Sequence, residues 1–367
     1  MNIVLTGGGT AGHVTPNITL LPELKKHFKR IDYIGSKTGI EKQLIQKENI
    51  PYHEITTTKF VRKNIFKNFC IPFLLWKGYK EAKKVLSAIK PNIVFSKGGY
   101  VSVPVILAAK KLHIPIIIHE SDLTMGLANK ISSKYATRVC TTFPETAKHM
   151  KHNKGVYTGV PIPKHTQTQQ NFANLTQNDE KLYNFLRKLQ KNKPLLLITG
   201  GSLGAQFINE QFEKEATNLL SKYYVVHITG KNHQTKISHQ NYFQTKFTYI
   251  MPYCMQQADF VISRAGSNSI FELASMQKPM LLIPLPKGNS RGDQVDNAKY
   301  FAKNNWAYSC TQSELTTGTA TLQQRLALLE KNKVTLQENL KKAKFENGTH
   351  KIIQLLLTYA NNVKDKL

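Results

Sequence analysis

The sequence is poor in cysteine and has no long hydrophobic run. Its four cysteines lie far apart and form no CxxC pair, at Cys70, Cys140, Cys254 and Cys310. This scatter argues against a disulfide framework or a zinc site and fits a reducing compartment. No stretch approaches the ~18 consecutive apolar residues of a membrane-spanning helix. The amino terminus has no basic segment followed by an apolar core, so we expect neither a spanning segment nor a signal peptide.

Acidic residues are also scarce. There are 23 Asp and Glu against 51 Lys and Arg, which gives a formal net charge of +28. Such an excess favours an anionic partner: a nucleic acid, an anionic lipid or a phosphorylated substrate. A generally lysine-rich proteome is the alternative, and the even spread of lysine along the chain favours it for most of the sequence. Because no RRM, KH, zinc-finger or helix-turn-helix signature is present, we expect no nucleic-acid partner.

Short apolar runs alternate with amphipathic stretches along the whole chain. A chain of 367 residues exceeds the ~250–300 residues that one core usually serves, so two domains are expected. The first half predicts buried strands at Ile3–Leu5, Ile31–Ile34, Ile93–Phe95, Ile114–Ile118 and Val139–Thr142. The second half predicts them at Leu195–Ile198, Tyr224–Ile228, Phe260–Ser263 and Met280–Ile283. Strands separated by helical patterns indicate an α/β fold in which helices cover both faces of a parallel sheet.

This alternation is interrupted at Pro161–Pro163. We therefore predict a Rossmann-like domain over residues 1–163, a linker or exposed excursion rich in Gln, Asn and Thr over 164–190, and a second Rossmann-like domain over 191–345. The tail from Thr321 onward has a polar helical pattern. The simplest architecture is two such domains facing a cleft, with ligands at the carboxyl ends of the strands.

A glycine-rich turn follows the first predicted strand and precedes a helix. Gly7, Gly9 and Gly12 give the spacing GxGxxG. Glycine lets the backbone turn tightly against a phosphate, and the helix N-terminus offers N–H groups and a partial positive charge. A tight turn without a ligand is one alternative. A dinucleotide site is another, but it needs an acid at the tip of the second strand, and Asp32 lies inside that strand. The Walker A spacing is absent, which counts against an ATPase.

The second half repeats this organisation. Gly200–Ala205 also follows a strand, and each half carries a further turn, at Phe95–Ser102 and Ile262–Ser269. His13, directly after the first turn, suits a general base, or it holds a phosphate without proton transfer. Glu272 lies on a helix opened by small polar residues. Its carboxylate has the chemistry to accept both hydroxyls of a ribose, although an exposed helical glutamate is the commoner identity.

The stretch from Phe60 to Leu86 combines aromatic residues with cations. Four aromatic residues are spaced to share one helical face: Phe66, Phe69, Phe73 and Trp76. Lysines that include Lys77 and Lys80 surround them. Pro72 permits two short helices or a kinked one. The pattern is typical of a membrane-surface contact, and the alternative is a helix that packs its aromatic residues into the core.

Taken together, these motifs resemble the MurG family, the UDP-N-acetylglucosamine transferases of glycosyltransferase family 28 that complete the lipid-linked disaccharide of bacterial peptidoglycan. The matching stretches follow in order: Gly7–Val14, Lys97–Ser102, His119–Asp122, Gly126–Lys130, Gly200–Ala205, Ser263–Ser269 with Glu272, and Asp293 and Gln294 with Asn297 and Ala298. The resemblance implies a GT-B fold, in which two Rossmann-like domains face a deep cleft. It also implies a C-terminal helix, residues 346–367, that returns to the first domain.

The resemblance implies that the second domain binds UDP-GlcNAc. It places Ile250 by the uracil, with the turn near Ser267, and puts Glu272 on the ribose hydroxyls. The diphosphate would lie at Gly201, Ser202 and Gly204, and the sugar at Asp293 and Gln294. It implies no cofactor and no metal, because donor binding in this fold does not rely on a DxD-bound metal.

The first domain would bind lipid I, the undecaprenyl-diphosphate-linked MurNAc-pentapeptide. The implied acceptor residues are Gly9, Thr10, Gly12, Gly98, Gly99, Tyr100 and Asn129. GlcNAc would pass with inversion to the 4-hydroxyl of MurNAc, giving lipid II, with His13 as the first candidate for the base and Glu120 or Asp122 behind it. Such an enzyme would be peripheral, on the cytoplasmic side of the cell membrane and in contact with its anionic leaflet.

The chain departs from the family pattern at three places, one of which is a glutamine pair of some relatives that is Asp293 and Gln294 here. Many relatives carry an Asn-Gly pair where Ser121 and Asp122 stand, and an arginine near the position of Lys164. A lysine supplies charge but not a bidentate grip. The nearest alternative function is that of a UDP-sugar epimerase-like enzyme of the same fold, which would not need the basic aromatic stretch.

Overall fold

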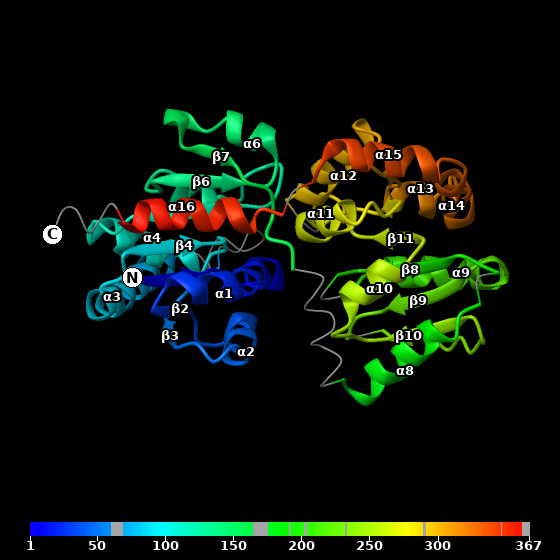
Figure 1. The fold of residues 1–367 in the computed structure, drawn as a ribbon, viewed down its shortest axis with the longest axis horizontal. Helices are drawn as coiled ribbons and strands as arrows, with labels where there is room; N and C mark the ends of the chain where they lie inside the picture. The colour runs from blue at the N-terminus through cyan, green and yellow to red at the C-terminus, as the bar shows by residue number, and fades with distance from the viewer. Residues whose placement is uncertain are drawn as a thin grey trace. The chain divides into compact units, whose positions relative to one another are not determined.

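The computed structural model describes residues 1–59, 69–163, 175–190, 192–201, 204–231, 233–288, 291–345 and 347–361. Within these residues the chain forms two compact units. Unit 1 comprises Met1–Ile162 together with the segment from Asn347 onward, and unit 2 begins at Pro163. The elements of each unit are labelled in Figure 1.

Unit 1 is built on a seven-stranded parallel sheet. Its strands are β1 (Asn2–Thr6), β2 (Arg30–Ser36), β3 (Tyr52–Ile55), β4 (Ile93–Ser96), β5 (Ile116–Glu120), β6 (Arg138–Thr141) and β7 (Gly155–Tyr157). They lie in the order β3-β2-β1-β4-β5-β6-β7, and every neighbouring pair is parallel. Because the strand order reverses between β1 and β4, the turns after these two strands meet at the carboxyl edge of the sheet.

Helices cover both faces of this sheet. They are α1 (Thr15–His27), α2 (Ile40–Gln46), α3 (Ile71–Ile89), α4 (Ser102–Lys111), α5 (Leu127–Ser133), α6 (Pro144–Lys148) and α16 (Thr349–Asn361), with 3₁₀ turns η1 (Ala11–His13) and η3 (Lys151–Asn153). The C-terminal helix α16 buries Ile352 and Leu356 in the same apolar cluster as Leu20 and Leu24 of α1. In Figure 1, α16 is the red helix of this unit.

Unit 2 repeats the arrangement with six parallel strands. These are β8 (Leu195–Thr199), β9 (Tyr224–Ile228), β10 (Tyr242–Thr245), β11 (Phe260–Ser263), β12 (Met280–Leu282) and β13 (Tyr308–Ser309), in the order β10-β9-β8-β11-β12-β13. The helices are α8 (Gln177–Arg187), α9 (Gln206–Lys222), α10 (Met251–Gln257), α11 (Ser267–Ser275), α12 (Asp293–Lys303), α13 (Gln312–Thr316), α14 (Leu322–Lys331) and α15 (Lys333–Ala343). The two halves are thus Rossmann-like, as predicted.

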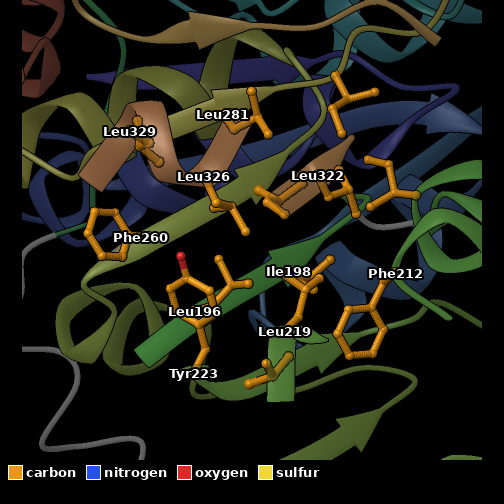
Figure 2. Packing of buried hydrophobic residues seen from close by; sticks show 14 of the residues in the cluster. Leu196, Ile198, Phe212, Leu219, Tyr223, Phe260, Leu281, Leu322, Leu326 and Leu329 are labelled. Carbon is orange, nitrogen blue, oxygen red and sulfur yellow. The ribbon is translucent and has the colours of Figure 1, made fainter. Parts of the chain in front are cut away.

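One hydrophobic core of unit 2 lies between its sheet and the helices α9 and α14. Figure 2 shows Leu196 and Ile198 of β8 among the labelled core side chains. Leu322, Leu326 and Leu329 of α14 are spaced by four and three positions, so they share one helical face and all point into this cluster. Burial of this face fixes α14 on the sheet.

The prediction of a linker over residues 164–190 is wrong in its second part. The helix α8 begins after Thr176, whose hydroxyl accepts a hydrogen bond from the Asp179 N–H at 3.2 Å. Leu182 and Leu186 are buried. Because α8 buries only a narrow face, its polar residues dominate the local composition. Residues 164–174, which include Lys164, lie outside the described part of the chain.

Helix α3 begins near Pro72, which lies in its first turn and does not kink it. A proline is tolerated there because the first N–H groups of a helix have no intrahelical acceptor. Residues 60–68, and with them Phe66, are outside the described residues. The sequence analysis missed β3, β7, β10 and β13. These strands span two to four residues each, which is too short for a periodic signal.

Candidate functional site: the carboxyl edges of the two sheets

The turn after β1 in unit 1 is held by polar side chains of neighbouring elements. The Tyr33 hydroxyl of β2 donates a hydrogen bond to the Gly7 carbonyl oxygen at 2.7 Å. Glu41 of α2 is fully buried, and its carboxylate accepts hydrogen bonds from the N–H groups of Gly9 at 3.1 Å and Ser36 at 3.2 Å. The backbone of the turn is therefore fixed by the protein itself.

The turn after β4 lies directly against this first turn. The Gly8 N–H donates to the Gly98 carbonyl oxygen at 3.3 Å. Gly99 has a φ of +81°, and a Cβ atom there would clash with the Gly8 carbonyl oxygen, so only glycine allows this approach. The Tyr100 ring covers Gly9. The structure thus brings together the four residues Gly9, Gly98, Gly99 and Tyr100 that the resemblance assigns to the acceptor.

Glu120, at the end of β5, organises the next turn. Its buried carboxylate accepts hydrogen bonds from the Asp122 N–H at 3.0 Å, the Gly126 N–H at 3.1 Å and the Asn129 side chain at 3.0 Å. Three donors occupy both carboxylate oxygens, which favours a structural role over proton transfer. Of the three candidates for the base, this geometry leaves His13 and Asp122 as the better two.

His13 ends the short 3₁₀ turn η1 and precedes α1. Its Nδ1 atom lies 2.9 Å from the Thr10 hydroxyl, and Gly12 is its neighbour in the turn. The hydrogen bond orients the imidazole ring at the carboxyl edge of the sheet. His13 and Thr10, both predicted site residues, therefore form one unit.

Asp32 does not offer the carboxylate that a dinucleotide site requires. It is fully buried, and Arg30 contacts both of its oxygens, at 2.7 and 3.0 Å. His53 of β3 lies 2.7 Å from Oδ1. Because these partners use the carboxylate inside the sheet, no oxygen remains for a ribose, and the dinucleotide alternative loses its key residue.

The turn after β8 in unit 2 parallels the turn after β1. The Gly201 N–H donates to the Thr199 hydroxyl at 3.3 Å, and the Gly204 N–H donates to the Gly201 carbonyl oxygen at 3.0 Å. A Cβ atom on Gly201 would meet nothing within 4 Å, so this part of the turn is open. Gly204 lies against the Thr229 carbonyl oxygen, leaving no room for a side chain. Ser202 lies outside the described residues.

Glu272, on α11, is held in a desolvated position. Burial raises the pKa of its carboxyl group to about 7. Within the described part of the chain, neither a hydrogen bond nor an ion pair reaches this carboxylate. Ser267 is the first residue of the same helix. A Cβ atom on Gly266, just before it, would meet nothing within 4 Å, so there is free space at this turn. A half-buried carboxylate that no described donor reaches is suited to bind the hydroxyl groups of a ligand.

The loop before α10 contains Ile250, the residue expected near the uracil. The Ile250 side chain is fully buried, so a uracil ring beside this residue would contact its backbone. The Ile250 N–H donates to the Thr248 hydroxyl at 3.1 Å, and that hydroxyl donates to the Asp179 carboxylate at 2.6 Å. The Tyr249 N–H donates to the same carboxylate at 3.2 Å. Helix α8 thereby fixes this loop.

The predicted sugar contacts lie at the start of α12. Asp293 forms an ion pair with Arg291, with 3.3 Å between Nε and Oδ1. The Gln294 side-chain oxygen accepts a hydrogen bond from the Leu285 N–H at 3.0 Å, which orients its amide. Asn297 donates to the Ala265 carbonyl oxygen at 3.2 Å and ties α12 to the turn after β11.

Aromatic rings are exposed on helix α3 and at Phe69, just before it. Phe69 is 78% exposed, Phe73 64% and Trp76 52%, which rules out the alternative that they pack into the core. The Lys80 Nζ atom lies 3.7 Å above the Trp76 ring, and Lys77 is exposed beside it. Large exposed aromatic residues in a cationic setting mark an interaction surface.

An open groove of about 500 Å³ borders this surface, between α3 and α4. Trp76 and Tyr79 line one side, and Leu107, Lys110 and Lys111 line the other. Among the described residues, no helix is long and apolar enough to span a membrane.

Sequence reasoning missed two residues that shape the turns. Glu41 lies in α2, after the second strand. The sequence analysis considered only Asp32, which lies inside that strand. Asp179 stands three positions after Thr176, which is a helix-capping spacing that the sequence displays. That spacing would have predicted the start of α8.

Two Rossmann-like units with a glycine turn at each switch point, and a desolvated carboxylate in unit 2, define a nucleotide-binding enzyme class. Residues 3–141 match the glycosyltransferase family 28 N-terminal domain, and residues 195–356 match the family's C-terminal domain. The chain belongs to glycosyltransferase family 28, which confirms the family predicted from its motifs.

Curated relatives match almost the whole chain. A UDP-N-acetylglucosamine–N-acetylmuramyl-(pentapeptide) pyrophosphoryl-undecaprenol N-acetylglucosamine transferase of Clostridium tetani is 45% identical, covering 97% of this chain and 98% of its own. A transferase of the same name from Clostridium botulinum is 46% identical, covering 97% and 99%. The chain is therefore a hexosyltransferase by family.

Solved structures share the fold. MurG of Acinetobacter baumannii superposes with a TM-score of 0.73 at 24% identity, covering 97% of this chain and 99% of that one. UDP-GlcNAc 2-epimerase of Neisseria meningitidis, solved with UDP-GlcNAc bound, gives 0.64 at 14% identity, covering 98% and 100%. These likenesses confirm the GT-B fold. The epimerase alternative has only a fold-level likeness in its favour.

Proposed function

We propose that this protein transfers GlcNAc from UDP-GlcNAc, with inversion, to the 4-hydroxyl of undecaprenyl-diphosphate-linked MurNAc-pentapeptide in cell-wall synthesis. The observation that carries the proposal is the 45–46% identity, over nearly the full length, to transferases named for this reaction. The local geometry of both units agrees with the chemistry that such a transfer requires.

The donor half of the proposal rests on unit 2. Glu272 accepts the ribose hydroxyls, because burial disfavours its charge and no donor among the described residues reaches its carboxylate. Ile250 meets the uracil through its backbone, and the oriented amide of Gln294 contacts the sugar. The departing diphosphate is stabilised by the N-terminus of α9, which follows the open turn at Gly201.

The acceptor half rests on unit 1. Its two glycine turns hold the lipid diphosphate, with Tyr100 packed over Gly9. The 4-hydroxyl oxygen attacks the anomeric carbon, the bond from that carbon to UDP breaks, and the hydroxyl proton passes to a base. His13, oriented by Thr10, is the first choice for that base, and Asp122 is the second.

The exposed rings of α3, together with Phe69 just before it, dock the enzyme on the anionic cytoplasmic face of the cell membrane, where the lipid-linked acceptor resides. Phe69, Phe73 and Trp76 enter the interface, while Lys77 and Lys80 meet anionic headgroups. Partial insertion of apolar rings combined with cationic attraction is sufficient for reversible binding without a spanning helix.

The test is a transfer assay with UDP-[14C]GlcNAc and a lipid I analogue that carries a shortened prenyl chain. The expected result is labelled disaccharide-lipid and one UDP released per transfer. Formation of UDP-N-acetylmannosamine without an acceptor would favour the epimerase alternative. Absence of transfer together with absence of UDP-GlcNAc binding would overturn the proposal.

A further inference from the structure

A buried lysine lies beneath the acceptor turns of unit 1. Lys97 follows β4 directly and is 1% exposed. Its Nζ atom lies 2.6 Å from the Nδ1 atom of His119 and 2.6 Å from the Ser121 hydroxyl oxygen. His119 lies in β5, and Ser121 lies in the turn that follows this strand and leads to Asp122. Lysine is seldom buried, because loss of hydration penalises its charge.

The neighbouring imidazole fixes the direction of one of these bonds. The Nε2 atom of His119 lies 2.9 Å from the Gly159 carbonyl oxygen, which can only accept, so Nε2 carries the hydrogen. Burial lowers the pKa of His119 well below its ordinary value, so the ring is neutral. Its Nδ1 atom therefore presents a lone pair, and Lys97 is the donor in this pair.

Charged and titratable groups face Lys97 from the adjoining strands. Glu120 and Asp122 stabilise its positive charge from the end of β5, and Cys140 lies on β6. Burial nevertheless outweighs them and lowers the Lys97 pKa to about 7. Between about pH 7 and pH 10.5, Lys97 is therefore mostly neutral in the native state, whereas the unfolded chain still holds this proton. Over this range the lysine costs stability, and stability rises with pH.

A costly buried charge that touches a site is commonly retained for function rather than for stability. We propose that Lys97 is a positioning residue of the acceptor site, which holds the end of β5 through His119 and the following turn through Ser121, and so places Asp122. The proposal rests on the transferase function above. The proposal also gives a role to Ser121, a position at which this chain departs from many relatives. The Ser121 hydroxyl oxygen accepts the hydrogen bond from Lys97.

The test compares Lys97→Met with wild type in stability and in acceptor kinetics. We expect the melting temperature of the variant at neutral pH to be equal or higher, because the buried charge is gone. We expect kcat/KM for the lipid I analogue to fall about tenfold, the order expected for loss of a charge-assisted hydrogen bond. KM for UDP-GlcNAc, which binds in unit 2, should change less than about twofold. The exposed Lys222→Met at the end of α9 is the matched control.

A pH profile separates positioning by the charged lysine from simple packing. In wild type, kcat/KM for the acceptor should fall as the pH rises through the Lys97 pKa, and Lys97→Met should lack this alkaline limb. Ser121→Ala keeps the lysine and removes one of its partners, so an intermediate loss of about threefold is expected. Wild-type acceptor kinetics in a folded Lys97→Met would overturn the inference. If Lys97→Met does not fold, wild-type kinetics in Ser121→Ala would overturn it. An inactive wild type would instead contradict the proposed function.

Discussion

The carboxylate of Asp179 accepts a hydrogen bond from the Thr248 hydroxyl at 2.6 Å, across 69 positions of sequence. This contact joins α8 to the loop that carries Ile250. Asp179 is 1% exposed, and it also accepts from the Thr176 hydroxyl at 2.6 Å and from the Tyr249 N–H at 3.2 Å. A buried carboxylate with three donors fixes the loop that we propose meets the uracil.

Replacement of Asp179 should therefore weaken donor binding. We expect Asp179→Ala to raise KM for UDP-GlcNAc about tenfold, because the Thr248 and Tyr249 groups lose a charged acceptor. Titration calorimetry with UDP and steady-state kinetics measure the effect. Asp179→Asn keeps the acceptor oxygen and should stay within about threefold of wild type. An equal loss in both variants, or a changed acceptor KM, would contradict this role.

The raised pKa of Glu272 predicts that donor affinity depends on pH. In the proposed donor site, the ribose hydroxyls donate more strongly to the ionised Glu272 carboxylate, so affinity for UDP-GlcNAc should rise as the pH passes through about 7. Glu272→Gln should bind about tenfold more weakly than wild type at about pH 8 and nearly equally at about pH 6, where the wild-type carboxyl is protonated. Calorimetry at both pH values measures this, and parallel profiles for the two proteins would refute it.

The same shift predicts the sign of a stability change. The folded pKa of Glu272 lies above its unfolded value, so the native state holds the proton more tightly between 4.5 and about 7. Stability of the ligand-free protein should fall as the pH rises through this window, and Glu272→Gln should remove that part of the fall. Urea denaturation at a series of pH values measures the difference. A steeper fall in the variant would contradict the assignment.

The general base can be tested at His13. We expect His13→Ala to lose at least about a hundredfold in kcat, while UDP affinity changes little because the proposed UDP site lies in unit 2. Thr10→Ala should give a smaller loss, since it removes only the hydrogen bond that orients the ring. Turnover of His13→Ala within a few-fold of wild type would shift the role to Asp122, and Asp122→Asn would then show the larger loss.

The α3 surface can be tested by flotation with vesicles. A fully buried aromatic ring contributes roughly 2 kcal/mol, so the double variant Phe73→Ser and Trp76→Ser should bind vesicles of anionic lipid at least about tenfold more weakly. Leu328→Ser, at another exposed apolar residue, is the matched control. Equal binding of the double variant would exclude this surface as the membrane contact. Loss of its activity on a water-soluble acceptor would indicate misfolding.

The sequence by itself determined the central strands, the two glycine turns and the family. These signals are local: buried parallel strands require continuous apolar runs, as in Ile93–Phe95, and a phosphate turn requires glycine at fixed spacing. Edge strands such as β3 and β13 were missed, because a short, half-exposed strand leaves little periodic pattern.

Only the tertiary structure decided which polar side chains serve those turns. Glu41, Lys97 and Asp179 contact groups that are distant in sequence, and any of them could equally be a surface residue when the sequence is considered alone. Likewise, the aromatic face of α3 follows from helical spacing, but its exposure does not. The physical reason is that burial and hydrogen-bond partners depend on which elements pack together, and this information is not local to any motif.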